Sequence, residues 1–181
     1  MRLLPKEPPH APTPRRRRTL CALAAWALAL LAASPAARAT PPDAALHGTW
    51  TVVAVDTYLP DGTRHPAFGP QPQGYLIYTP EGTMSVTLAA GERPPFAHPQ
   101  PRQGSLAEKA SVADSFSAYA GRYSVDAATH TVVHHLHIAS FPNWQGSDQV
   151  RRYQLDGDIL TLSTPEPVAG TTSVLRFRRA R

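Results

Sequence analysis

Apolar and polar residues alternate along most of the chain beyond residue 48, and this period of two restricts the fold more than any other feature. Met84, Val86 and Leu88 show it clearly, because Ser85 and Thr87 separate them. Such alternation is typical of strands with one buried and one solvated face. It predicts eight strands, over residues 49–58, 74–79, 83–89, 122–126, 131–140, 149–155, 159–163 and 173–179.

The predicted strands are mostly joined by short connections that carry turn-forming pairs. Asp61-Gly62, Glu81-Gly82 and Asp156-Gly157 are pairs that close or cap β-hairpins, since glycine adopts backbone angles that other residues avoid. Eight short strands in succession indicate a sandwich or an up-and-down barrel. An eight-stranded barrel either fills its interior with side chains or holds one small ligand there.

The alternation also sorts the side chains by face. On most strands one face is clearly the more apolar, and that face is expected to line the interior. The rows predicted to point inward are Trp50, Val52 and Ala54; Met84, Val86 and Leu88; Tyr123 and Val125; Val132, His134, Leu136 and Ile138; Leu160 and Leu162; Leu175 and Phe177.

One segment departs from this period and predicts a single helix over residues 106–120. Ser105 and Glu108 have the spacing of a capping box, in which each side chain binds a free backbone N–H at the helix start. Apolar residues then recur at helical spacing, and Gly121 stands where a helix would stop. Residues 92–102, which precede the helix, are too rich in proline for regular structure and predict a loop over one end of the barrel.

The first 39 residues have the features of a secretory signal peptide with a basic, proline-rich extension. Four arginines at 15–18 precede an apolar run at 20–33, and the run leads to the small-x-small pattern of a cleavage site at residues 37–39. At about 14 residues the run is shorter than the roughly 20 that a membrane-spanning helix needs. We therefore expect export to the periplasm or secretion, by the general or the twin-arginine route.

Without this leader the charge changes sign. The full chain carries 18 basic and 13 acidic residues, of which residues 1–39 hold 7 and 1, so the remainder carries 11 and 12. A nucleic-acid-binding domain needs a clustered basic face of its own, so we expect no nucleic-acid partner. We also expect no membrane-spanning segment in the mature chain. We expect a tether at 40–45 and one domain at 46–181, long enough for a hydrophobic core. The single cysteine, Cys21, lies in the leader, so packing alone must stabilise that domain.

Four histidines occupy eight positions between His130 and His137, a density that suggests a metal site or an acid–base group. Alternation places His134 on the inward face of its strand, and it places His135 and His137 on the outward face. Zinc needs three or four protein ligands, and no further ligand is evident near the outward pair, so we expect no metal. A buried His134 needs a partner or a ligand to offset its burial, so it is either a satisfied core histidine or a contact to bound molecules.

Arg151 is the second candidate site residue. It shares a face with Tyr153 and Leu155, so its guanidinium is expected to point inward, where it needs a partner. Two alternatives stand open: a salt bridge at the barrel mouth to Glu92 or Asp114, or an oxygen of a ligand. Further candidates for the wall of a pocket are Tyr78, Tyr119 and Trp144, which have equally ordinary packing roles.

Four stretches of the chain resemble the bacterial and fungal lipocalin-like domain family. They are LHGTW at 46–50, the segment at 61–96, AYAGRYSVD at 118–126 and the segment at 132–165, which contain the elements Tyr-Thr-Pro-x-Gly and Pro-Asn-Trp-x-Gly. The resemblance covers nearly all of the mature chain. It implies an eight-stranded antiparallel up-and-down barrel of the calycin type, with one helix, closing around a pocket.

The same resemblance implies a set of recurrent polar and aromatic positions, which are Tyr78, Arg93, Tyr119, His134, Trp144 and Arg151. Gly48-Thr49-Trp50 is also similar to the Gly-x-Trp that opens the first strand of lipocalins. There an arginine of the last strand packs on the tryptophan through a cation–π contact, and Arg178 or Arg179 matches that place.

Two functions follow as hypotheses. The first is a protein that binds a small, largely apolar or amphipathic ligand in the barrel cavity, at the six positions just named. The second is an isomerase or cyclase in which His134 transfers protons and Arg151 stabilises an oxyanion or carboxylate. No cofactor is expected under either hypothesis. The sequence assigns neither the ligand nor an oligomeric state.

Overall fold

Strands form where apolar and polar residues alternate. The computed structural model describes residues 44–181, so the predicted signal peptide at 1–39 and most of the predicted tether lie outside the described residues. The strands are β1 (Gly48–Tyr58), β2 (Arg64–Pro66), β3 (Gln73–Tyr78), β4 (Thr83–Ala89), β5 (Phe116–Asp126), β6 (Thr131–Ala139), β7 (Asp148–Asp156), β8 (Ile159–Ser163) and β9 (Thr172–Arg179). The helical elements are α1 (Leu106–Ser115) and the 3-10 turns η1 (Ala44–Leu46), η2 (Pro101–Gln103) and η3 (Pro142–Trp144).

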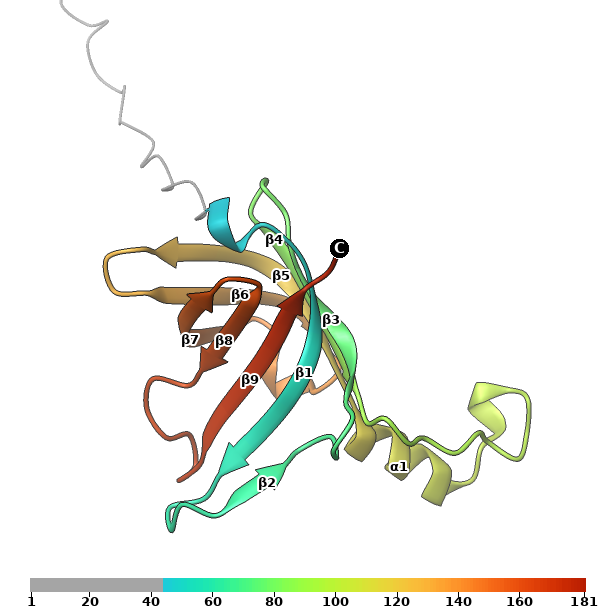
Figure 1. Ribbon diagram of the computed structural model, residues 1–181. Coiled ribbons are helices and arrows are strands. Elements are labelled where there is room, and N and C mark those ends of the chain that lie inside the picture. The colour runs from blue at the N-terminus through green and yellow to red at the C-terminus, as the bar shows by residue number, and fades with distance from the viewer. Residues whose placement is uncertain (1–43) are drawn as a thin grey trace, which may run out of the picture. The chain divides into compact units, whose positions relative to one another are not determined.

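The strands form a closed antiparallel up-and-down barrel (Figure 1). From β3 to β9, each strand pairs with the next in the sequence, and β1 pairs with both β3 and β9, which closes the sheet. Eight strands therefore surround the interior of the described domain. The additional strand β2 pairs only with the last three residues of β1; the period of two does not predict it, because three residues are too few to show a period. The predicted fold class is confirmed.

Side chains fill the closed end of the barrel. Trp50 is fully buried and its indole N–H donates to the Leu46 carbonyl at 2.9 Å. The guanidinium of Arg179 lies 4.1 Å from the Trp50 ring centroid and donates to the carbonyls of His47 and Ala45. The cation–π contact is therefore confirmed, and Arg179 forms it.

Two bulges correct the predicted inward rows. In the β1–β9 ladder the register shifts between Val52 and Ala54, so Val55 is buried and Ala54 is only half-buried. In the β5–β6 ladder the register shifts by one residue of β6 after Leu136, and Ile138 is 62% exposed. A bulge inserts one residue and reverses the facing of everything beyond it, so the prediction that Ala54 and Ile138 point inward was wrong.

The predicted helix is too long by five residues. α1 ends at Ser115, and residues 116–120 begin β5. Phe116 and Ala120 fit helical spacing, but Tyr119 alternates equally well with the buried Tyr123 and Val125, and pairing with β4 and β6 decides for the strand. The capping box between Ser105 and Glu108 is present as predicted.

Gly121 is a strand residue and does not stop the helix. A Cβ on Gly121 would lie 1.9 Å from the His135 carbonyl oxygen, where β6 bulges toward β5. The glycine is required because the two backbones approach too closely for any side chain.

The proline-rich loop before α1 contains no regular structure except η2. It packs along α1, since Glu108 accepts hydrogen bonds from the backbone of Ala97 and of Ser105. Loop and helix extend together from one end of the barrel (Figure 1). No helix within residues 44–181 is long and apolar enough to cross a bilayer.

Candidate functional site

A cavity of about 590 Å³ lies at the end of the barrel where α1 is attached. The ends of β1, β4, β5, β6 and β9 meet there because neighbouring strands of an up-and-down barrel run antiparallel. Its lining comes from these strand ends, from β7, from the segments after β2 and β6, and from α1 and η3. The lining residues are Val55, Thr57, Ala67, Phe68, Leu88, Lys109, Val112, Ala113, Asp114, Phe116, Ser117, Tyr119, Ser140, Phe141, Trp144, Arg151, Ser173 and Leu175.

The deep part of this cavity is apolar. Val55, Leu88 and Leu175 are buried side chains at its base. Phe68 and Phe116, both half-buried, add aromatic surface to the lining. A lining of this kind, with a few polar groups at fixed positions, is the usual composition of a small-molecule site.

His134 lies behind the cavity wall between two tyrosines. It is fully buried on β6, with its Nε2 2.5 Å from the Tyr78 hydroxyl and its Nδ1 3.4 Å from the Tyr119 hydroxyl. Tyr119 belongs to the cavity lining, whereas Tyr78 and His134 do not. The structure therefore brings three predicted site residues together, and of these only Tyr119 faces the cavity.

The surroundings of His134 favour its neutral form. The pKa of His134 is lowered from 6.5 to about 3, chiefly by burial and in addition by the electrostatic effect of Arg151 and His135. A neutral imidazole has one donor and one acceptor nitrogen, and the two tyrosine hydroxyls match them.

The two tyrosines also remain neutral. Burial is the main cause that raises the pKa of Tyr78 well above 10 and that of Tyr119 above 10, and the nearby Arg151 opposes both shifts only in part. The ring of Tyr78 also packs against the ring of Tyr123, with 4.5 Å between the ring centroids. The cluster is thus a chain of neutral hydrogen-bonding groups at physiological pH.

Arg151 points inward from β7 and lines the cavity as predicted. Its guanidinium donates to the Val150 carbonyl at 2.8 Å and to the Gln149 side-chain oxygen at 3.1 Å. Among the ion pairs of residues 44–181, none includes Arg151, so the expected alternative of a salt bridge to Glu92 or Asp114 is not formed. The positive charge at the cavity is balanced by no carboxylate contact.

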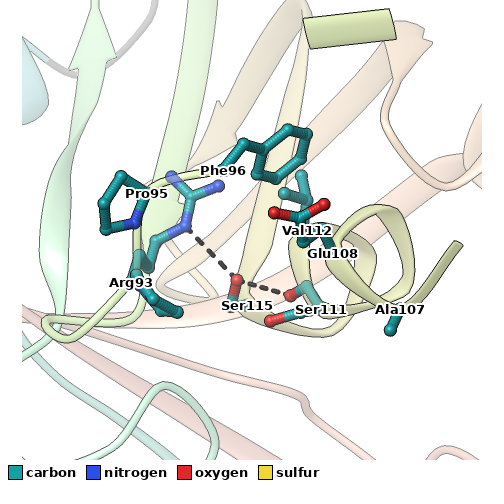
Figure 2. Close-up of a pocket in the computed structure, with 9 residues that line it drawn as sticks. Arg93, Pro95, Phe96, Ala107, Glu108, Ser111, Val112 and Ser115 are labelled. Carbon is teal, nitrogen blue, oxygen red and sulfur yellow. Dashed lines mark hydrogen bonds between the residues drawn. The ribbon is translucent and has the colours of Figure 1, made fainter. Parts of the chain in front are cut away.

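Trp144 and Arg93 occupy different places. Trp144, at the end of η3, lines the cavity and meets the rings of Tyr119 and Phe141 edge-on. Arg93 lies on the proline-rich loop, where it lines a second hollow beneath α1 and donates to the Ser115 hydroxyl at 3.3 Å (Figure 2). Arg93 therefore does not line the barrel cavity, although its guanidinium lies 5.4 Å from the ring centroid of Phe116, which does.

His135 lies on the outer face of β6, as predicted, with partners from both neighbouring strands. Its Nε2 is 3.0 Å from the Ser124 hydroxyl and its Nδ1 is 2.8 Å from an Asp148 carboxylate oxygen. This carboxylate could not be predicted from spacing, because it comes from β7 and reaches His135 through strand pairing. No group of three metal-ligating side chains occurs in the described domain, and the exposed His137 does not join His135.

The sequence did not predict the contribution of α1 and of Phe116 to the cavity. Lys109, Val112 and Asp114 line it from the helix, whose attachment to the barrel end follows from where β5 begins. Phe116 was assigned to the helix, so its place on the wall was missed. Alternation gives no signal for this place, because Phe116 shares a row with Ala118 and Ala120, on the face opposite to Ser117 and Tyr119.

Comparison with known proteins agrees with this architecture. A family model described as a lipocalin-like domain matches residues 47–178. The chain belongs to this family. The sequence match and the strand topology thus agree on a lipocalin-like barrel.

One curated relative of this lipocalin-like protein is a 4'-hydroxy-3'-methoxypropiophenone carrier protein from Aspergillus oryzae. The two are 39% identical over 59 residues, which cover 29% of this chain and 53% of the relative. The chain therefore spans about half the length of this curated relative.

Proposed function

We propose that this lipocalin-like protein binds a small, largely apolar ligand in the cavity at the barrel mouth. One observation carries the proposal: a cavity of about 590 Å³ with an apolar base and with Tyr119 and Arg151 among the polar groups of its wall. Cavities of a few hundred Å³ with this composition hold small organic molecules. The relative from Aspergillus oryzae is named as a carrier protein for 4'-hydroxy-3'-methoxypropiophenone, an aromatic ketone, and this supports the same class of function.

The cavity is tested by blocking it. Wild-type protein is titrated with the neutral apolar dye N-phenyl-1-naphthylamine, whose fluorescence rises when it leaves water. Ala113 lies on α1 in the cavity lining, so Ala113→Trp places an indole in the opening. We expect saturable dye binding by the wild type and at least tenfold weaker binding by Ala113→Trp.

The matched control is Ala110→Trp on the same helix. Ala110 is exposed and belongs to neither hollow beside α1, so this variant carries the same added surface without entering the cavity. It should bind the dye as the wild type does. Equal binding by all three proteins, or no saturable binding by the wild type, would refute the proposal.

The alternative of an isomerase or cyclase receives less support. It requires His134 and Arg151 to reach one substrate atom, but both ring nitrogens of His134 face tyrosine hydroxyls and the side chain is fully buried. Proton transfer would have to pass through Tyr119, whose pKa is raised above 10. Such a group is a poor base at neutral pH, so we favour binding.

We also propose that the protein acts outside the cytoplasm, in the periplasm or after secretion. The support is the leader at residues 1–39, with its arginine cluster, apolar run and Ala37-Arg38-Ala39 sequence. Fractionation of cells followed by N-terminal sequencing should find a chain that begins at Thr40. A cytoplasmic chain that retains residues 1–39 would contradict this.

A further inference from the structure

Tyr119 and Arg151 are two of the polar residues that line the cavity, and the hydrogen bonds behind them determine what these two groups offer to a ligand. The other polar residues of the lining are Thr57, Ser117, Ser140 and Ser173 on or beside the strands, and Lys109 and Asp114 on α1. Tyr78 is 1% exposed, and its hydroxyl is 2.5 Å from His134 Nε2. The described chain gives this hydroxyl no other hydrogen-bond partner. A buried O–H requires an acceptor, so Tyr78 is the donor and Nε2 the acceptor.

This assignment fixes the tautomer of His134. A neutral imidazole with an accepting Nε2 carries its proton on Nδ1. That N–H is directed at the Tyr119 oxygen, 3.4 Å away. Tyr119 therefore accepts from His134, and its own hydroxyl proton is left for a partner on the other side, where Tyr119 lines the cavity.

Arg151, like Tyr119, offers hydrogen-bond donors to the cavity. A guanidinium has five N–H groups and no acceptor, and two of its bonds go to Val150 and Gln149. The remaining N–H groups have no carboxylate partner within residues 44–181. Asp114 is the one carboxylate of the cavity lining, and it is exposed on α1. The same helix also places the cationic Lys109 in the lining.

We propose that the ligand is an aromatic or conjugated molecule that presents a hydrogen-bond-accepting oxygen, a carbonyl or an anionic oxygen, to Tyr119 and Arg151. The donors of the wall select the oxygen, and the rings of Phe68, Phe116 and Trp144 contact the flat apolar body. A ligand group that can only donate leaves both wall groups unpaired. This inference rests on the proposed function and names the ligand chemistry of the same cavity.

The test compares two molecules of one shape. Propiophenone and propylbenzene differ only in a carbonyl that replaces a methylene, and the affinity of each is measured by displacement of N-phenyl-1-naphthylamine. Wild-type protein should bind propiophenone at least tenfold more tightly. Tyr119→Phe and Arg151→Met should each reduce that preference several-fold, and the double variant should bring it close to one.

The matched controls are Tyr75→Phe and Arg152→Met. Tyr75 is 53% exposed on β3 and Arg152 is exposed on β7, and neither lines the cavity. Both should retain the preference of the wild type. In the two wall variants the affinity for propylbenzene should stay unchanged, which shows that the apolar cavity is intact.

The outcomes separate the two proposals. If the wild type binds neither compound nor the dye, the proposed function itself fails. If it binds all three but without preference, or if the wall variants weaken both compounds equally, the cavity is a general apolar site and the inference about the oxygen is overturned.

Discussion

At the scale of single residues, His134 is a titratable group that its surroundings hold neutral. Burial excludes water from the ring, and the nearby positive charge of Arg151 opposes protonation, so the pKa falls to about 3. Two tyrosine hydroxyls satisfy the ring nitrogens. His134 thus functions as a fixed hydrogen-bonding dipole between Tyr78 and Tyr119.

The depressed pKa predicts a pH dependence of stability. The unfolded chain binds a proton at His134 below about pH 6.5, whereas the folded chain binds it only near pH 3. This contribution is therefore fully present above pH 6.5 and is lost as the pH falls toward 3. Between pH 7 and pH 5 the free energy of unfolding should fall by roughly 2 kcal/mol more in the wild type than in His134→Gln.

Urea unfolding at several pH values measures this difference. The control is His137→Gln, which removes an exposed imidazole from the same strand and should keep the wild-type dependence. Other ionisable groups contribute to both proteins alike, so the comparison isolates His134. Identical slopes for wild type and His134→Gln would mean that the pKa of His134 is the same in the folded barrel as in the unfolded chain, which would contradict the prediction.

His134 should also matter for binding more than its neighbours on β6. His134→Ala removes the group that orients the Tyr119 hydroxyl and leaves a void behind the cavity wall, so propiophenone should bind at least tenfold more weakly. The combined change His135→Ala and His137→Ala alters only the outer face and should leave the affinity nearly intact. Isothermal titration measures the affinity of both variants for propiophenone. If the double variant bound more weakly than His134→Ala, the functional histidines would be those on the outer face of β6.

At the scale of elements, the period of two was sufficient to predict eight strands, because each has a row of buried or half-buried residues on one face. It failed where the register changes. The bulge after Leu136 reverses Ile138, and no local pattern marks it, since it depends on how β6 meets Gly121 of β5. The end of α1 was missed for a related reason: small residues such as Ala118 and Ala120 fit a helix and a strand equally well.

Gly121 tests this account of the bulge. Gly121→Ala would place a methyl group 1.9 Å from a backbone oxygen, which cannot move without breaking the β5–β6 ladder. The comparison is Gly157→Ala, which meets open space but has a φ of +56° and should cost about 1 kcal/mol. Thermal unfolding should rank Gly121→Ala as clearly the more damaging change. A loss no larger than that of Gly157→Ala would show that the two strands can separate freely.

The same limit applies to the candidate site. Alternation was sufficient to place His134 and Arg151 inside the barrel, because each lies on a strand with an apolar face. The division between Tyr119, which faces the cavity, and Tyr78, which lies behind His134, depends on depth along the barrel axis. A pattern that distinguishes only two faces of a strand carries no information about depth.

At the scale of the whole molecule, the barrel depends on the pairing of its first and last strands. β1 and β9 form a long ladder, and the chain between them holds all the other strands. Closure of this kind leaves few free strand edges. It also makes the ladder a contact of high sequence separation, so groups that stabilise it act on the barrel as one unit.

Arg179 is a side chain that stabilises the pairing of β1 with β9. It lies on the Trp50 ring and donates to two carbonyls that precede β1, so it joins the end of the chain to the start of the domain. Arg179→Met keeps much of the apolar contact but removes the charge and both donors. We expect it to lower the free energy of unfolding by roughly 2 kcal/mol, given the usual size of a cation–π contact and of charged hydrogen bonds.

The sequence left Arg178 and Arg179 as equal candidates, so Arg178→Met is the matched control. Arg178 is exposed on the outer face of β9 and should tolerate the change. Denaturant unfolding followed by Trp fluorescence and by circular dichroism should give coincident transitions for both variants, because the closed barrel unfolds as one unit. If Arg178→Met were the more damaging variant, the last strand would pair with β1 in a register shifted by one residue.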